Sequence, residues 1–501
     1  MMRRDDEAKQ RSFGDEASAM AAVPADHILL KMGRAIEWAA IEKELQGYYD
    51  RWVGRPGWPP ALLLRMLLLE QYGKLSDRQV GEQVGYNLLY RRFVGLGLDE
   101  TVPDDTTLVK FRARVGEEGI QKVFEAINAQ WAAAGLIGEQ RRVFDGVHLW
   151  ANVAQRSLAA LLRKGRQVLI EALERADEAA AAPLRQQYLG DAEPASGSKE
   201  EVVAAEAERS RALVEAVEKV SDEGVQARVA QVKTLLAGDG DRVVSFDDPD
   251  ARWGHKTAEK TFCGYKAHEA QDPDSRLITG VTVVAGNAHE GVQSDALLAA
   301  QSPPLKEGTT IIADGYYNNA TTVAQVQEAK MQPCFAGLTV ERVSDKFRYD
   351  GEQDYVVCEA GKHSVGKVRV DNGDLYYFSM SDCAPCPLRD NCLTRGEREG
   401  KAQPRRRVYL SDVRKAKILA GEAGRQWRKE QLKLRGRIEP KFSEQMNQHG
   451  LRRARYWGLA KVTVQVLLNV ITVNAKRAVK LLHQAVAAPP PTPSLMMEAV
   501  S

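Results

Sequence analysis

The stretch RRVFDGVHLWANV, residues 141–153, decides the fold, because alternating bulky residues replace the helical pattern of the preceding segment. It reads as a β-strand with Asp145 in its middle. Four further strands are indicated by FCGYKAHEAQD, RLITGVTVVAGN, TTIIADGYYNN and QPCFAGLTV. Three strands in hairpin order and two that are joined through helices predict a mixed sheet in an α/β fold. The fourth strand of such a sheet commonly lies beside the first, which would bring Asp145 and Asp314 together.

Residues 1–135 are predicted to be helical and to form an N-terminal DNA-binding domain. In the segment DDTTLVKFRARV, either Asp104 or Asp105 is expected to cap a helix. Short capped helices suit a helix-turn-helix-like protein, with Arg112 and Arg114 directed toward DNA. An ordinary helical bundle with solvated charges explains the same pattern equally well.

The remainder of the chain divides by composition. An Ala-, Glu- and Arg-rich segment with nearly balanced charges reads as a solvated helical arm or an interaction element, and PPPTPS reads as a disordered tail. The predicted domains are the first parts of the α/β core at 136–154 and 241–340, a helical insertion at 155–240, a Cys-rich insertion at 341–410, core helices at 411–485 and the tail at 486–501.

Charge is distributed unevenly along the chain. Residues 393–482 contain 23 Lys and Arg against 7 Asp and Glu, although the formal charge of the whole protein is only +2. Such a basic segment is expected to bind a nucleic acid backbone. Glu439 lies inside it and would repel phosphate unless a divalent cation lay between them. This contradiction indicates metal-dependent chemistry on nucleic acid.

Two-metal phosphoryl transfer requires carboxylates that bridge a pair of divalent ions. Two strand-borne aspartates, Asp145 and Asp314, and a helix-borne Glu439 can supply them. Each has a simpler explanation: an Asp at a strand end is often a turn former or helix cap, and a Glu on a basic helix is often a salt-bridge partner. Glu444 is a rival third ligand, but it lies about 140° around the helix from Glu439, so both cannot face the same metals.

A second constellation consists of four cysteines, Cys358, Cys383, Cys386 and Cys392. The C-x2-C core within DCAPCPLRDNC, with one Cys downstream and one upstream, fits four thiolates around a structural Zn²⁺. An iron–sulfur cluster and four free thiols are the alternatives, and His363 is an alternative ligand. Other histidines near strand ends are more simply explained as hydrogen-bonded structural residues.

The order of the motifs VFDGVHLWANV, GYKAH, VVAGNAHEG, IIADGYYNN and RGRIEPKFSEQMNQHGLRRARYWGLAK resembles that of the RNase H-like DDE transposases of bacterial insertion sequences. The N-terminal stretches PALLLRMLLLEQYGKLSDRQV and VPDDTTLVKFRARV are similar to the helical domain of the same family. The resemblance covers most of residues 25–480. It implies an RNase H-like mixed sheet of five strands in the order 3-2-1-4-5.

Carried over residue by residue, the resemblance implies that Asp145, Asp314 and Glu439 are the catalytic carboxylates and hold two Mg²⁺ or Mn²⁺ ions. The chain departs from the family pattern at Leu432 and Met446, which occupy the usual Tyr and Lys positions of the last motif. Basic neighbours would then hold DNA in their place. The predicted DNA-binding residues around Glu439 are Arg435, Arg437, Lys441, Arg452, Arg453 and Arg455.

The resemblance therefore implies an enzyme that binds the terminal inverted repeats of its element, cleaves the DNA strands and joins them to target DNA. Synapsis of two ends implies a homodimer or a larger assembly. The alternatives are a catalytically inactive repressor derived from a transposase and a metal-dependent structure-specific nuclease. The apolar runs at 60–69 and 462–473 are too short to span a bilayer, so we expect no membrane association and a cytoplasmic, nucleoid-associated bacterial protein.

Overall fold

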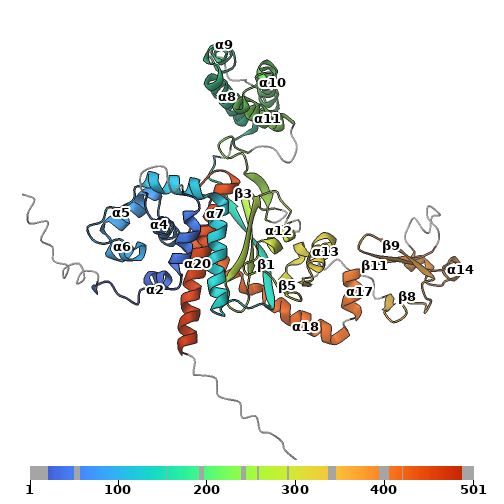
Figure 1. Cartoon of the computed structure of the whole chain (residues 1–501). Coiled ribbons are helices and arrows are strands. Elements are labelled where there is room, and N and C mark those ends of the chain that lie inside the picture. The colour runs from blue at the N-terminus through green and yellow to red at the C-terminus, as the bar shows by residue number, and fades with distance from the viewer. Residues whose placement is uncertain are drawn as a thin grey trace, which may run out of the picture.

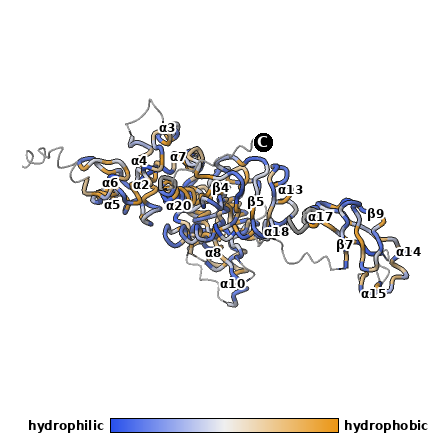
Figure 2. The backbone as a smooth tube through the Cα atoms, turned by 90° about the horizontal axis from the view of Figure 1, so that it is seen from below, coloured by the Kyte–Doolittle hydropathy of each residue, from blue (hydrophilic) through white to orange (hydrophobic). Residues whose placement is uncertain are grey.

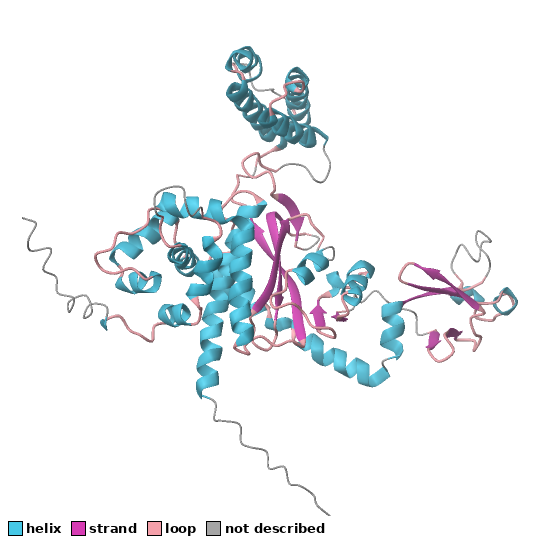
Figure 3. Cartoon of the chain, in the orientation of Figure 1, coloured by secondary structure: helices cyan, strands magenta, loops and turns pink. Residues whose placement is uncertain are grey.

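The computed structural model describes the chain from residue 21 to residue 487 with several gaps (Figures 1 and 3). Most of the predicted tail, from residue 488 onward, lies outside the described residues. None of the described helices is long and apolar enough to cross a membrane. The described ranges are 21–49, 57–154, 156–190, 197–237, 244–256, 259–289, 293–336, 346–393, 405–419 and 421–487.

A mixed, twisted sheet occupies the centre of the molecule (Figure 3). Five strands follow one another in the order β4–β3–β1–β5–β6, with β1 antiparallel to β3 and parallel to β5. The strands are β1 (Arg141–Trp150), β2 (Arg252–His255), β3 (Thr261–Gln271), β4 (Ile278–Ala285), β5 (Thr310–Ala313) and β6 (Gln332–Phe335).

The expectation of five strands is wrong, because β2 makes the sheet six-stranded. β2 and β4 pair with successive halves of the same edge of β3, and the change of partner occurs at Gly264. Gly264 has a φ of +155°, and a Cβ there would lie 2.0 Å from the carbonyl oxygen of Leu149. Only glycine fits this crossing of three strands. β2 was missed because RWGH is too short to show alternation.

Helices of the N-terminal region pack beside the sheet. Asp104, not Asp105, caps the longest of them: its carboxylate accepts a hydrogen bond of 2.7 Å from the backbone N–H of Thr107. The helices are α2 (Ile28–Arg34), α3 (Trp38–Gln46), α4 (Pro60–Gly73), α5 (Asp77–Tyr86), α6 (Leu88–Val94) and α7 (Asp105–Ala133).

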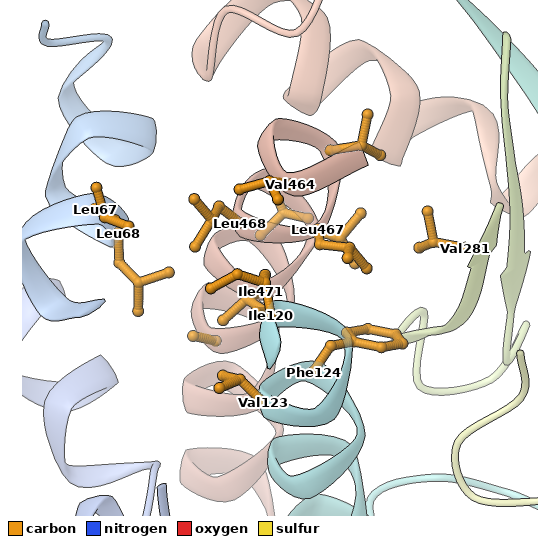
Figure 4. Close-up of a cluster of buried hydrophobic side chains, with 14 of the residues drawn as sticks. Leu67, Leu68, Ile120, Val123, Phe124, Val281, Val464, Leu467, Leu468 and Ile471 are labelled. Carbon is orange, nitrogen blue, oxygen red and sulfur yellow. The ribbon is translucent and has the colours of Figure 1, made fainter. Parts of the chain in front are cut away.

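The C-terminal helix α20 (Leu459–Ala487) connects these helices to the sheet. It lies between α4 and β4 and also packs on α7 (Figure 4). Buried side chains of α20, α4, α7 and β4 belong to a single hydrophobic cluster. In Figure 2 this helix appears as an apolar stretch inside the body of the molecule. The N-terminal helices and the sheet therefore share one continuous core.

The other face of the sheet is covered by two short helices, α12 (Ser294–Ala299) and α13 (Ala320–Glu328) (Figure 1). Phe144 and Ile311 pack there with Tyr317, in a cluster separate from the core around α20. Successive residues of a strand point to opposite faces. Since Val143, Val147 and Ile312 belong to the α20 side, Asp145 has the same parity and projects toward that side.

Two insertions extend from the sheet (Figures 1 and 2). The first is a group of four helices, which has its own hydrophobic core: α8 (Leu158–Ala176), α9 (Glu178–Leu189), α10 (Lys199–Val217) and α11 (Glu223–Ala237). The second contains the four clustered cysteines and consists of β7 (Phe347–Asp350), β8 (Tyr355–Cys358), β9 (Gly366–Val370), β10 (Gly373–Tyr377), α14 (Met380–Cys383), α15 (Arg389–Cys392) and β11 (Arg407–Ser411).

The chain returns from the Cys-rich insertion through α17 (Asp412–Leu419) and α18 (Gly421–Lys433), and α18 packs against β5 and β6. A 3₁₀ turn (Arg435–Arg437), α19 (Glu439–Ser443) and a π-helical turn (Glu444–Gln448) follow. A regular helix through Glu439 was expected. This broken path brings residues 437–453 along the sheet, from the β3–β4 turn to the end of β1.

Candidate active site

Asp145 and Asp314 lie on neighbouring strands. β1 and β5 pair in parallel, with Arg141 opposite Thr310 and Val143 opposite Ile312. If this register continued for two more residues, Asp145 would lie opposite Asp314, which directly follows β5. Neighbouring strands are about 4.8 Å apart. Asp314 is extended, with φ −77° and ψ −175°, and it begins the 3₁₀ turn Gly315–Tyr317 by accepting a hydrogen bond of 2.9 Å from the N–H of Tyr316. Both aspartates therefore face the α20 side of the sheet.

A third carboxyl group on this face was not anticipated from the sequence. Glu269 of β3 pairs directly across from Asp145 and is fully buried. The pKa of Glu269 is raised to about 8, mainly by burial and to a lesser extent by the charge of Asp145, whereas Gln445 and Lys441 act in the opposite direction. The sequence does contain a signal for this residue, because Glu269 follows Tyr265 and Ala267 in the alternating row of β3 residues that face the core.

Gln445 is the residue of the last motif that reaches these carboxyl groups. Its amide nitrogen donates to both oxygens of Glu269, at 3.0 and 3.2 Å. It lies six residues beyond Glu439, which is exposed and makes no hydrogen bond or ion pair with any residue that the structure describes. The neighbours of Glu439, Ile438 and Phe442, are buried in the core and hold the start of α19 in place.

Glu444, the rival third ligand, has other partners. One of its carboxylate oxygens lies 3.2 Å from the Nζ of Lys441, and the other lies 2.6 Å from the Nζ of Lys476. Its pKa is lowered by these two cations in spite of partial burial, which acts in the opposite direction. The carboxylate of Glu444 is therefore neutralised by lysines.

Two of the three predicted carboxylates carry donor atoms suited to a divalent cation. Asp145 and Asp314 are hard oxygen donors of the kind that Mg²⁺ and Mn²⁺ prefer, and they lie on adjacent strands. Glu439 does not complete the set in this conformation. Among the residues that the structure describes, no group of three or more His, Cys, Asp or Glu side chains is arranged to hold a metal ion.

The four clustered cysteines line one small cavity of about 30 Å³. Cys358 ends β8, Cys383 ends α14 and Cys392 ends α15, so three elements converge there. Burial raises the pKa of the Cys392 thiol, the nearby Arg406 lowers it, and the other three cysteines raise it further. The electrostatic effect of each thiol on Cys392 is evidence of their proximity. All six cysteines are free.

The predicted DNA-binding arginines of the N-terminal region have distinct environments. Arg112 is largely buried and donates two hydrogen bonds of 2.5 Å to Asp77. Arg114 is exposed, with its guanidinium 4.5 Å from the ring centre of Tyr49. Arg112 thus holds α7 against α5, whereas Arg114 is accessible to a ligand.

The basic residues around Glu439 are partly engaged with the protein. Arg437 donates to the carbonyl oxygen of Pro273 at 3.0 Å, and Arg455 donates to that of Leu75 at 2.7 Å. Lys441 is buried, Arg435 is half-buried, and Arg452 and Arg453 are exposed beside the end of β1.

Two protein-family models match the chain. A transposase domain (DUF772) matches residues 17–114, which cover the N-terminal helices through the first part of α7. A transposase DDE domain matches residues 357–479, which include the four clustered cysteines, Glu439 and most of α20. Asp145 and Asp314 precede the second match.

Among solved structures, the chain is similar to a piggyBac transposase synaptic complex with hairpin DNA, determined by cryo-EM. The identity is 8%, the TM-score is 0.32, and the alignment covers 92% of this chain and 74% of that one. A likeness at this level establishes nothing about the site. The family models are more informative, since two separate transposase domains occur in the expected order in one chain, and together they support a DDE transposase of the insertion-sequence type.

Proposed function

We propose that the protein is an active transposase that cleaves the ends of its element and joins them to target DNA through Asp145, Asp314 and Glu439. The observation that supports the proposal is the parallel pairing of β1 with β5 through Val143 and Ile312. Continued by two residues, this register would set the two aspartates side by side on the face that Gln445, six residues beyond Glu439, reaches. The proposed RNase H-like core has the strand order 3-2-1-4-5 when the strands are counted without β2, which corresponds to β4–β3–β1–β5–β6.

Asp145, Asp314 and Glu439 would hold the Mg²⁺ or Mn²⁺ ions of the family. When bound, such ions activate the attacking oxygen and stabilise the leaving oxygen of the phosphodiester. The protein's own contribution is positioning. β1 and β5 would fix the two aspartates, and the proposal requires the segment that begins at Glu439 to bring the third carboxylate toward them.

The proposed DNA surface consists of exposed and half-buried cations near this site and the buried Lys441, together with the N-terminal helices. Their charges would neutralise backbone phosphates and leave base recognition to other groups. The proposed residues are Arg114, Arg435, Arg437, Lys441, Arg452, Arg453 and Arg455. Arg112 would contribute indirectly, since it positions α7 through Asp77. Two element ends in one synaptic complex would require at least a homodimer.

The test is a cleavage and strand-transfer assay on DNA that carries the element's ends. We expect Asp145→Asn, Asp314→Asn and Glu439→Gln each to lower the rate by about 100-fold or more while DNA binding persists. Matched controls are Asp295→Asn and Glu430→Gln, which change exposed carboxylates of α12 and α18 and should leave the rate unchanged.

The possible outcomes separate the alternatives. Full activity of a carboxylate variant removes that residue from the site, and full activity in EDTA rules out the metal-dependent scheme. Cleavage without joining identifies a nuclease. DNA binding by the wild-type protein without any cleavage in Mg²⁺ or Mn²⁺ identifies a repressor.

We also propose that Cys358, Cys383, Cys386 and Cys392 bind one structural Zn²⁺. Four thiols that line one cavity support it, since Zn²⁺ favours four thiolate ligands. Zinc binding would require them to adopt a coordinating arrangement that the described side chains do not have here. Elemental analysis should find about one zinc per chain. The double variant Cys383→Ser with Cys386→Ser should contain no zinc, whereas Cys263→Ala should contain as much zinc as the wild type. Iron with visible absorption would identify an iron–sulfur cluster, and a metal-free wild-type protein would leave four free thiols.

A further inference from the structure

A basic pocket of about 120 Å³ lies between α19, α20 and the turn that joins β3 to β4. Pro440, which directly follows Glu439, lies at its edge. The charged residues that line it come from three segments distant in the sequence: Arg276, Lys441, Glu444, Lys476, Arg477 and Lys480.

Positive charge in this pocket exceeds negative charge. Glu444 is its only carboxylate, and it is already shared by Lys441 and Lys476. No ion pair joins Arg276, Arg477 or Lys480 to any acidic residue in the described parts of the chain. Three of the five cations therefore retain their charge without a compensating carboxylate.

The cations are held together although they repel one another. Burial lowers the pKa of Arg477, and the charge of Arg276 lowers it further. Lys441 is only 5% exposed, and its pKa is lowered first by burial, with Arg477 and Lys476 adding to this effect against the opposing influence of Glu444. An anion bound among these groups would relieve both the repulsion and part of the desolvation.

The pocket is also fixed before any ligand arrives. The Nε of Arg477 donates to the carbonyl oxygen of Ser275 at 2.6 Å, which leaves the two terminal nitrogens of its guanidinium for another acceptor. Arg276 adopts a left-handed backbone conformation with φ of +62°, and its N–H donates to the carbonyl oxygen of Asp272 at 2.8 Å. Lys441 is anchored to the carbonyl oxygen of Val473 at 3.1 Å.

We propose that this pocket binds a backbone phosphate of the DNA next to Glu439. Guanidinium and ammonium groups from three segments can donate to several oxygens of one phosphate, and Arg276 and Lys480 remain exposed at the mouth where a duplex can approach. The proposal rests on the proposed function and deepens it. The contact would set the distance between the DNA strand that is cleaved and the carboxylate of Glu439.

The experiment measures the affinity of the full chain for a fluorescent duplex as a function of salt concentration. A non-specific duplex suffices, because phosphate contacts do not depend on sequence. In Arg276→Gln with Lys480→Gln, we expect the slope of log K against log salt to become shallower by about 2. Arg276→Lys with Lys480→Arg keeps both charges and should retain the wild-type slope.

The matched control is Arg211→Gln with Lys219→Gln, which removes one exposed Arg and one exposed Lys from the helical insertion. It should leave the slope unchanged. An equal loss in the control would overturn the proposal, since it would reflect net charge alone. A wild-type slope in the pocket variant, together with normal cleavage, would overturn the pocket and leave the proposed function intact.

A small free anion is the competing ligand, and inorganic phosphate tests it. If phosphate raises the melting temperature of the wild-type protein but not that of the pocket variant, while both have the same salt slope, the pocket binds a free anion and not DNA. Absence of cleavage by the wild-type protein would count against the proposed function, whereas the salt slope would still decide the pocket.

Discussion

At the scale of single residues, Glu70 shows how burial makes stability depend on pH. Glu70 is 1% exposed and lies beside Asp77 and Arg112. Burial, together with the hydrogen bond and charge of Asp77, raises its pKa from 4.5 to about 9 against the opposing charge of Arg112. The folded protein therefore keeps a proton on Glu70 at a pH where the unfolded chain has lost it.

The direction in which stability changes with pH follows from the number of protons that each state binds. Between about pH 4.5 and pH 9 the folded state binds more protons at Glu70 than the unfolded state, so its contribution to stability falls as pH rises through this interval. The pKa of Asp77 is lowered, so the stability that its ionised carboxylate contributes is lost only in more acidic solution. The wild-type protein should therefore lose unfolding free energy between about pH 5 and pH 9. In Glu70→Gln this loss should be smaller by at least about 1 kcal/mol.

Urea denaturation of the two proteins across this range provides the measurement. Glu100→Gln serves as the control, since it changes an exposed carboxylate of the same region. Identical pH profiles for wild type and Glu70→Gln would mean that Glu70 is ionised in the folded protein.

At the scale of elements, α20 is the piece on which the rest of the core depends. Leu468 is fully buried on α20, in the same cluster as Leu67 of α4 and Ile120 of α7 (Figure 4). Leu468→Ala should lower the free energy of unfolding by about 2–5 kcal/mol, because the removed methyl groups leave a cavity that surrounding elements fill only partly. Lys461→Ala, on the exposed side of the same helix, should change it by less than about 0.5 kcal/mol.

Thermal or urea unfolding measures both variants. Because α20 joins the N-terminal helices to the sheet, the two regions should lose structure together in a single transition. Separate transitions for the helical region and the sheet would show that the core is not continuous.

The same elements show what the sequence could predict. Residues 141–150 were recognised as a strand because their alternation is local, and the pairing of β1 with β5 followed from hairpin and crossover order. Asp104 was recognised as a candidate cap from its position before a helical pattern. These features depend on neighbours in the chain or on general rules of sheet topology.

The missed features depend on contacts between distant segments. β2 exists because it covers the part of β3 that β4 leaves unpaired, and the contact of Gln445 with Glu269 joins residues 176 positions apart. The turn after α19 is π-helical rather than regular, which the pattern of side chains does not reveal. The position of Glu439 was therefore harder to predict from the sequence than the positions of Asp145 and Asp314.

At the scale of the whole molecule, the helical insertion is attached to the body through two closely placed strand ends. The N–H groups of Gly458 and Leu459 donate to Asp248 and Asp250, at 3.0 and 2.8 Å. The indole N–H of Trp457 donates to the carbonyl oxygen of Asn152 at 3.0 Å. One short segment therefore holds both the exit from β1 and the entry to β2, independently of the helices between them.

The insertion also has a core of its own. Its buried apolar residues all lie between Leu161 and Phe246, and they form a cluster distinct from that of the sheet. Arg166 and Glu206 form a buried ion pair that connects α8 to α10. A region with its own core and closely spaced ends is expected to fold as an independent unit.

We therefore expect a chain in which a short Gly/Ser linker replaces residues 157–244 to retain the sheet and to melt within a few degrees, roughly, of the wild-type temperature. The excised segment 157–246 should give a helical circular dichroism spectrum and a cooperative transition. Leu169→Asp in that segment should abolish the transition, since Leu169 is fully buried in its core. If the linker variant instead loses the sheet, the segment around Gly458 does not hold the two strand ends by itself, and the insertion is part of the folding unit of the body.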